Sequence, residues 1–194
     1  STTSDQYPGT ERRRDIIFIA FVLLVFAVVV LRIAWLSDDA LITLRYIDNF
    51  QNGHGLRWNV AERVQGFTHP LWLILLTATT WVTGNLMHTA IWVGVIVSVA
   101  AVCVLALAAR SRTGMLVAFS ALMSSKAFID YSTSGLENPL THLLMGAFAL
   151  VLFREISRVK EGERFSLRTV LVLATIASLG VITRHDIALL YAPA

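Results

Sequence analysis

Charged residues are scarce in this sequence of 194 residues: only 15% are Asp, Glu, Lys or Arg, whereas 56% are hydrophobic. A soluble domain usually carries about 25% charged residues. This deficit, together with long apolar runs, indicates that a bilayer is the solvent for much of the chain. The sequence also lacks a basic and aromatic surface stripe, and its formal net charge is only +3. We therefore expect no nucleic-acid partner.

Cysteine is nearly absent, since the only one, Cys103, lies within an apolar run. One cysteine excludes an internal disulfide and a cysteine-rich zinc site, and it leaves the redox compartment open. A signal-peptide cleavage site is also missing, because the first apolar run, Ile16 to Leu36, continues directly into Ser37. About 21 residues suffice to cross roughly 30 Å of hydrocarbon, so this run is predicted to be a retained membrane anchor.

Apolar segments recur along the whole chain and predict an all-α, polytopic transmembrane helical bundle. The predicted segments are 16–36, 70–82, 88–109, 115–129, 139–153 and 169–182. Those at 70–82 and 115–129 are short for a span, and the second is broken by Ser124-Ser125-Lys126. The sequence stops directly after an apolar stretch. We therefore expect 16–194 to be the N-terminal portion of a larger membrane domain.

Basic residues set the expected topology, because cytoplasmic loops of membrane proteins carry an excess of Lys and Arg. The cluster Arg12-Arg13-Arg14 places residues 1–15 in the cytoplasm as a polar tail. The first span then runs outward, and 37–69 form the first external loop. We therefore expect a multi-pass protein of the cell (inner) membrane with a cytoplasmic N-terminus.

Two further basic segments, 110–112 and 154–168, create a conflict in this topology. If both are cytoplasmic, an odd number of crossings must lie between 70 and 109, although that stretch contains two apolar segments. Either one short segment does not cross fully, or the arginines at 110–112 break the rule. The segment 154–168 has more basic residues and carries more weight, which places 130–138 outside and also 184–186 if the last run crosses fully.

A short amphipathic helix is predicted at 40–52, in the first external loop. Arg45, Asp48, Asn49 and Asn52 recur at i, i+3, i+4, i+7 spacing and form one polar stripe. Gly53 is a suitable C-terminal stop. Such a helix could lie on the membrane surface as a juxtamembrane element.

The acidic pair Asp38-Asp39 precedes this helix and has two readings. An aspartate at this position caps a helix and complements its dipole. A carboxylate near a bilayer boundary could instead accept a proton from a sugar hydroxyl or bind a divalent cation. One residue of the pair could cap the helix while its neighbour carries out chemistry.

Other polar side chains are candidates for substrate contacts. The stretch 57–72 is rich in Arg, Asn, Gln and Trp, which bind phosphates, hydroxyls and sugar rings, although it also suits an interfacial aromatic belt. Glu137 stands at the mouth of the span that follows Pro139, where it could also cap a helix. Arg184 and Asp186 lie between apolar stretches and must pair or line a wet cavity. A simple Arg184–Asp186 salt bridge is the alternative to a functional role.

Five motifs in order carry a family resemblance. They are DDALITLR at 38–45, NGHGLRWN at 52–59, ERVQGFTHPLW at 62–72, SGLE at 134–137 and TRHD at 183–186. With this order of span, acidic pair and amphipathic helix, the chain resembles the GT-C superfamily of membrane glycosyltransferases, which use polyprenyl-phosphate sugars. Within it, the motifs are similar to those of the actinobacterial terminal β-(1→2)-arabinofuranosyltransferases of cell-wall arabinan synthesis.

The resemblance implies an inverting transfer of arabinofuranose from decaprenyl-phosphoryl arabinose, at the extracytoplasmic face. The acceptor would be a hydroxyl of arabinan in arabinogalactan or lipoarabinomannan, and Asp39 or Asp38 would be the general base. The implied substrate contacts are Arg45, Arg63, Gln65, His69, Trp72, Glu137, Arg184 and Asp186. No cofactor is implied with certainty beyond a divalent cation in some members, for which Asp39 and Glu137 are the candidates here. Members of the family are longer and usually carry a C-terminal soluble domain.

Two other functions stay open. The first is a GT-C transferase for another polyprenyl-phosphate sugar, such as mannose. The second is a transporter or a non-catalytic membrane subunit. A transporter would place charges at mid-span within paired broken helices. Here the ionisable residues gather at one membrane face, which favours surface chemistry on a lipid substrate.

Overall fold

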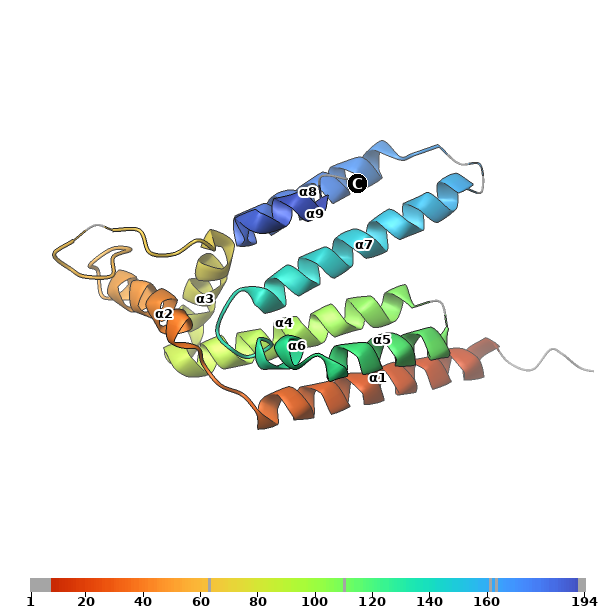
Figure 1. Ribbon diagram of the computed structural model, residues 1–194, viewed down its shortest axis with the longest axis horizontal. Helices are drawn as coiled ribbons and strands as arrows, with labels where there is room; N and C mark the ends of the chain where they lie inside the picture. The colour runs from red at the N-terminus through yellow and green to blue at the C-terminus, as the bar shows by residue number, and fades with distance from the viewer. Residues whose placement is uncertain (1–7, 63, 110, 161, 163, 192–194) are drawn as a thin grey trace, which may run out of the picture.

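The computed structural model of the chain describes residues 8–62, 64–109, 111–160, 162 and 164–191, and every regular element among them is a helix. The helices are α1 (Pro8–Arg32), α2 (Asp38–Gln51), α3 (Pro70–Thr83), α4 (Leu86–Ala108), α5 (Arg112–Ser124), α6 (Lys126–Asp130), α7 (Asn138–Lys160), α8 (Leu167–Thr183), η1 (His185–Ile187) and α9 (Ala188–Tyr191). The prediction of an all-α fold is confirmed (Figure 1).

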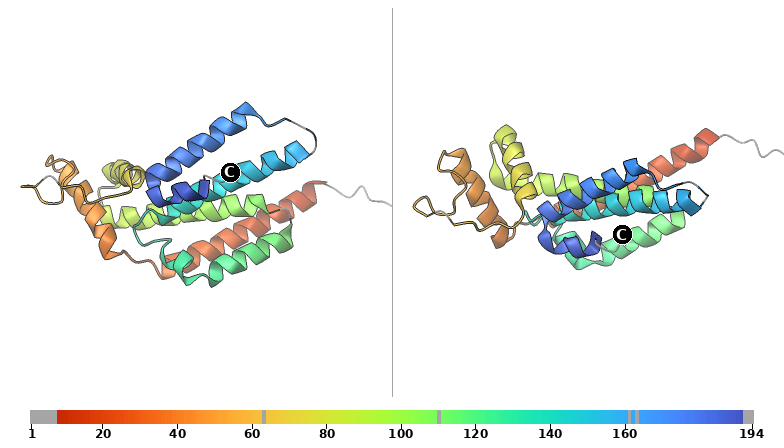
Figure 2. Two further views of the ribbon diagram at one scale, coloured as in Figure 1. Left: turned by 45° about the horizontal axis from the view of Figure 1, so that its top comes forward. Right: turned by 90° about the horizontal axis from the view of Figure 1, so that it is seen from above.

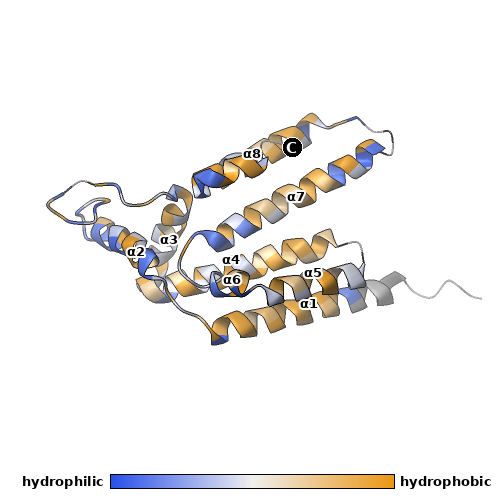
Figure 3. Cartoon of the chain, in the orientation of Figure 1, coloured by the Kyte–Doolittle hydropathy of each residue, from blue (hydrophilic) through white to orange (hydrophobic). Residues whose placement is uncertain are grey.

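Three of the described helices are long and apolar enough to cross a membrane: Asp15–Arg32 within α1, all of α4, and all of α7. The apolar helices α3 and α8 are shorter. Figure 3 shows that the long helices are apolar along most of their length, whereas polar residues concentrate at helix ends and on α2. Apolar faces of this length are stable only in a lipid environment, so the chain is a membrane protein.

The helices α1, α4, α5, α7 and α8 lie side by side, with α4 packed against α1, α3, α5 and α7 (Figures 1 and 2). At one end of this bundle lie α2, α3 and the loop between them. The start of α1 and the links α4–α5 and α7–α8 lie at the opposite end. Because α3 stays at the first end, α4 alone runs the length of the bundle between residues 70 and 109. This arrangement favours the alternative in which the short apolar segment at 70–82 does not cross fully.

Two predicted helix ends need correction. The first helix ends at Arg32 and not at Leu36. Residues 34–37 are irregular because they bond to a distant turn; the indole Nε1 of Trp35, for example, donates to the carbonyl of Asp130 at 2.9 Å. In contrast, α7 continues to Lys160, so the basic segment predicted to begin as a loop at residue 154 is helical there. Cations in the last turn of a helix are favoured by its dipole, which explains the extension.

The helix α2 confirms the predicted amphipathic element but not its polar stripe. Arg45 and Asp48 are exposed, whereas Asn49 is buried. The Asn49 amide donates to the backbone carbonyls of Arg57 and Trp58, at 2.7 and 3.0 Å, because the following loop folds back over it. Gly53 follows the C-cap Asn52 and adopts a φ of +80°, as expected of a C-terminal stop.

Two apolar clusters hold these elements together. The first joins α2, α3 and α4 through side chains such as Ile47, Trp72 and Leu76. The second joins α1, α4 and α6 through Phe26, Val102 and Phe128 among others. The first cluster positions α2 and α3 at the end of the bundle.

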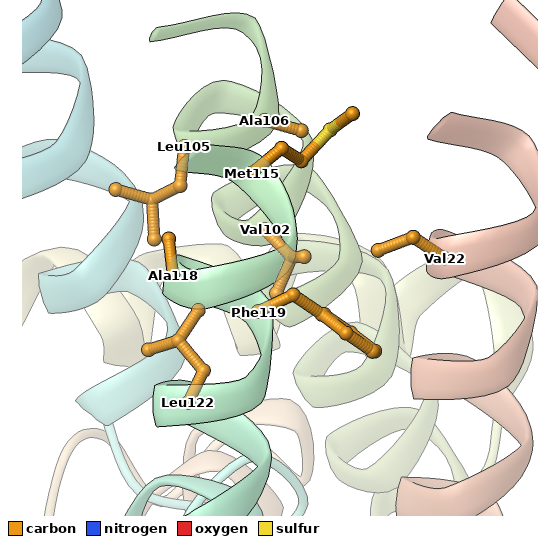
Figure 4. A pocket seen from close by; sticks show the side chains of 8 residues that line it. All are labelled: Val22, Val102, Leu105, Ala106, Met115, Ala118, Phe119 and Leu122. Atoms are coloured by element: carbon orange, nitrogen blue, oxygen red, sulfur yellow. The ribbon is translucent and has the colours of Figure 1, made fainter. Parts of the chain in front are cut away.

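A small cavity of about 10 Å³ lies between α1, α4 and α5 (Figure 4). All the side chains that line it, including Met115 and Phe119, are apolar. A buried water needs two to four polar partners, which these side chains do not offer. The cavity is therefore a packing gap and not a binding site.

The segment 130–135, here called the linker turn, is tied to three other parts of the chain. Its carbonyls accept hydrogen bonds from Trp35 Nε1, Ser37 N, Ser98 Oγ and Trp72 Nε1, at 2.8 to 3.2 Å. Gly135 has a φ of +81°, and a Cβ there would lie 2.7 Å from that of Ala40. Only glycine fits this conformation and this close approach. The linker turn leads directly into Glu137, and it thus fixes where that carboxylate stands.

Candidate active site

An open cleft with a volume of about 760 Å³ lies at the end of the bundle that carries α2 and α3. Its walls come from α2, the loop before α3, the start of α7 and the segment after α8. Five of the ten predicted site residues line it: Asp39, His69, Glu137, Arg184 and Asp186. Side chains far apart in the sequence therefore meet in one polar hollow next to apolar helices.

The two aspartates of the acidic pair have different surroundings. The N-cap of α2 is Ser37, whose Oγ accepts a hydrogen bond from the Asp39 backbone N–H at 3.2 Å. The Asp38 carboxylate accepts from the same N–H at 3.0 Å, so Asp38 supports the helix start while Ser37 caps it. Asp39 lines the cleft, and within the described part of the chain its carboxylate has no partner. The Asp38 carboxylate therefore stabilises the start of α2, whereas the Asp39 carboxylate is free to contact a ligand in the cleft.

A chain of polar contacts runs through His69. Thr43 Oγ1 and His69 Nε2 are 2.7 Å apart, and His69 Nδ1 lies 3.4 Å from Glu137 Oε2. His69 precedes Pro70, the first residue of α3, and makes no side-chain capping bond, so its ring is available for these contacts. The chain of contacts connects α2 to the start of α7.

Arg184 contacts three polar side chains at the other side of the cleft. Its Nε lies 2.8 and 3.0 Å from the two Asp186 oxygens, and its Nη1 lies 3.3 Å from Asn138 Oδ1 and 3.9 Å from Glu137 Oε1. The hydrogen bond between Arg184 and Asp186 lowers the pKa of Asp186 and raises the pKa of Arg184. The predicted salt bridge is present, yet Arg184 is only part-buried and still faces the cleft.

The other predicted site residues lie outside the cleft. Arg45 donates to the Trp58 carbonyl at 3.2 Å and stands over the Trp58 ring. Gln65 is exposed and donates to the Phe67 carbonyl at 3.3 Å. Trp72 is fully buried in the first apolar cluster, where its indole N–H supports Gly135. Arg63 lies outside the described residues.

Sequence reasoning missed several residues that line the cleft. Thr43 lies four residues after Asp39 and so on the same face of α2. Asn138 directly follows the predicted Glu137 and accepts from Arg184. Tyr131 and His185 complete the rim. The i, i+4 spacing from Asp39 could have indicated that Thr43 lies on the cleft face of α2. Its apolar neighbours in the sequence, however, are typical of an ordinary buried threonine.

Carboxylate oxygens are the ligands that Mg²⁺, Ca²⁺ and Mn²⁺ prefer, and Asp39 and Glu137 both line the cleft. Over the part of the chain that the structure describes, no group of three or more His, Cys, Asp or Glu side chains could hold a metal ion. The donor chemistry suits a divalent cation, but no complete ligand set accompanies it.

The stability of the protein is expected to fall as the pH drops below about 6.5, because of His69. Burial lowers the pKa of His69, and the neighbouring Glu137 only partly opposes this effect. An unfolded chain therefore binds a proton at His69 at a higher pH than the folded chain does, which destabilises the fold on acidification. Thermal unfolding between pH 8 and pH 5 should show a smaller loss in His69→Gln than in the parent protein. An identical pH dependence in both would contradict this assignment.

The fold and the cleft define a class: a helical membrane protein with a carboxylate- and guanidinium-lined cleft at one end of its bundle. The chain is similar to two curated proteins, each named terminal β-(1→2)-arabinofuranosyltransferase. It is 28% identical to the one from Mycobacterium tuberculosis over 170 residues, covering 80% of this chain and 27% of that protein. It is 33% identical to the one from Corynebacterium glutamicum over 110 residues, covering 53% of this chain and 16% of that protein.

These relatives confirm the resemblance that the five motifs predicted. The chain spans about a quarter of the length of the first relative and less of the second. No family model matches the chain, and no solved structure matches it. The similarity therefore rests on sequence, and the cleft provides the geometry to interpret it.

Proposed function

We propose that this chain provides the catalytic cleft of a GT-C membrane glycosyltransferase that moves arabinofuranose from decaprenyl-phosphoryl arabinose to a hydroxyl of cell-wall arabinan. The acceptor would be arabinogalactan or lipoarabinomannan. The observation that carries the proposal is the meeting of Asp39, His69, Glu137, Arg184 and Asp186 in one cleft beside apolar helices. The names of the two relatives support the arabinofuranosyl group and the β-(1→2) linkage.

In the proposed reaction, Asp39 removes the proton from the acceptor hydroxyl. The hydroxyl oxygen forms a bond to the anomeric carbon from the side opposite the phosphate, and the bond from that carbon to the phosphate oxygen breaks. Decaprenyl phosphate leaves with the electron pair, and the configuration inverts. Arg184 lines the same cleft and is suited to contact the phosphate with its charge and its donors. A negatively charged leaving group is stabilised by such a cation.

The proposed protein lies in the cell membrane with several spans, its N-terminus in the cytoplasm and its cleft on the extracytoplasmic side. The distribution of basic residues supports this orientation. Arg112, Arg154, Arg158 and Lys160 lie near the links α4–α5 and α7–α8, which are both at the end of the bundle opposite the cleft. Basic residues favour the cytoplasmic side of a membrane.

The donor is tested with purified full-length protein offered decaprenyl-phosphoryl arabinose and decaprenyl-phosphoryl mannose side by side. We expect transfer from the arabinose donor to an arabinan oligosaccharide, with a new β-(1→2) linkage in the product. A preference for mannose would instead support a GT-C transferase for another sugar. No transfer from either donor would favour a non-catalytic subunit or a transporter, although the ionisable residues of the cleft lie at the bundle end and not at mid-span.

A further inference from the structure

Thr43, His69 and Glu137 form a continuous chain of polar contacts across the wall of the cleft. The Thr43 hydroxyl and His69 Nε2 are 2.7 Å apart, and the opposite ring nitrogen faces Glu137 at 3.4 Å. A carboxylate accepts hydrogen bonds but does not donate them, so the proton of the neutral imidazole belongs on Nδ1. His69 Nε2 is then an acceptor, and the Thr43 hydroxyl donates to it. Each contact has a defined direction.

The burial of this chain argues against direct contact with substrate. Thr43 is 1% exposed, His69 is buried, and the Glu137 side chain is 13% exposed. Both ring nitrogens of His69 are already occupied by protein partners. A substrate entering the cleft would therefore meet Asp39 and Arg184 first, while His69 stands behind them.

We propose that His69 is a positioning residue that clamps α2 to the start of α7, and that Thr43 is its anchor on α2. Asp39 lies one helical turn before Thr43 on the same face, and Glu137 lies 3.9 Å from Arg184. The clamp thereby sets the placement of the proposed base relative to the proposed phosphate contact. This inference rests on the proposed function and gives Thr43 and His69 a role that requires no contact with sugar or phosphate.

The test is a set of variants in the full-length enzyme: Thr43→Val, His69→Phe and the double variant. A misplacement of about 1 Å at a reacting group costs about 100-fold in rate, so we expect each single variant to lower kcat by about 10- to 100-fold. The KM for the donor should change by less than about threefold, because the clamp does not touch the donor. Thr43→Ser restores the hydroxyl and should keep kcat near that of the parent.

The kcat of the double variant shows whether Thr43 and His69 act through one shared contact or independently of each other. Once His69 is absent, loss of the Thr43 hydroxyl should have little further effect, so the two losses should not multiply. Thr77→Val is the matched control, because Thr77 is also a buried helical threonine but donates only to the Leu73 carbonyl of its own helix. It should leave kcat within about twofold of the parent, because the Thr77 hydroxyl that is replaced by a methyl group bonds only within α3 and lies outside the cleft lining.

Three outcomes would overturn the clamp: an unchanged kcat in Thr43→Val, multiplicative losses in the double variant, or a rise in donor KM at constant kcat. The last of these would make His69 a substrate contact. The same four proteins also give a thermal-stability cycle, in which additive shifts of Tm would show that Thr43 and His69 do not interact. A parent enzyme inactive with every polyprenyl-phosphate sugar would instead overturn the proposed function.

Discussion

Replacing Asp39 with Asn in the full-length protein is expected to lower kcat for arabinose transfer by about 100- to 10,000-fold, the contribution typical of a general base. The amide keeps the volume of the carboxylate but cannot accept the proton of the acceptor hydroxyl. Asp39 is exposed and makes no side-chain bond to the described residues, so the fold should not depend on it. Initial rates with decaprenyl-phosphoryl arabinose and an arabinan acceptor measure the effect, and donor binding should be retained.

Asp38→Asn is the matched control for this prediction. The Asp38 carboxylate supports the first turn of α2 through the Asp39 backbone N–H, and it does not line the cleft. Removing its charge should cost about 0.3 to 1 kcal/mol of helix-dipole stabilisation and leave kcat within a few-fold of the parent. Were Asp38→Asn inactive and Asp39→Asn active, the roles of the two aspartates would be exchanged. If both variants turned over like the parent, neither would be the base.

Replacing Arg184 with Gln is expected to raise the KM for the lipid-linked donor by about 10- to 100-fold, since a hydrogen bond to a charged group contributes about 1.5 to 3 kcal/mol. The guanidinium is the positive side chain of the cleft lining, and it faces Glu137 and Asp186. Its removal leaves two carboxylates that repel a phosphate. The ion pair with Asp186 is exposed to solvent and contributes little to folding, so the variant should still fold.

Arg45→Gln provides the comparison for Arg184→Gln. Both arginines were predicted as donor contacts, but Arg45 stands over the Trp58 ring and donates to the Trp58 carbonyl outside the cleft. We expect its loss to change the donor KM by less than about threefold. Rates measured over a range of concentrations of the lipid-linked donor give the KM of both variants and show which arginine contacts the phosphate. A large effect of Arg45→Gln with a normal Arg184→Gln would move the phosphate site toward the loop after α2.

Much of the fold could be predicted from the sequence, because apolar helices in a bilayer follow from length and hydropathy alone. The break at Ser125 was visible for the same reason: Ser125 both ends α5 and accepts from the Phe128 N–H to begin α6. The meeting of Asp39, Glu137 and Arg184 was also foreseeable in outline. Charged groups outside the apolar runs must gather at helix ends, and the family motifs indicated which ones belong together.

What the sequence could not show depends on contacts between distant residues. The end of α1 at Arg32 is set partly by the hydrogen bond from the Trp35 indole to the Asp130 carbonyl, and no local sequence pattern predicts this bond. The burial of Asn49 depends on the loop that folds back over it. From the sequence, Trp72 was predicted to contact the substrate. In the structure it is fully buried, and its indole N–H donates a hydrogen bond to the Gly135 carbonyl. The periodicity of apolar residues predicts which residues share a face of a helix, but it does not predict which other segments pack against that face.

The linker turn connects three parts of the cleft through its backbone. It holds the backbone just before Asp39 through Ser37 and the indole of Trp72 near His69, and it continues into Glu137. We therefore expect Asp39, His69 and Glu137 to move together with this segment and to keep similar mutual distances. The region should behave as one rigid body, with slowly exchanging amides at Ser37 and within the turn. In the proposed enzyme, we expect any rearrangement at the cleft to involve Gly66 and Thr68, which line it but do not belong to the linker turn.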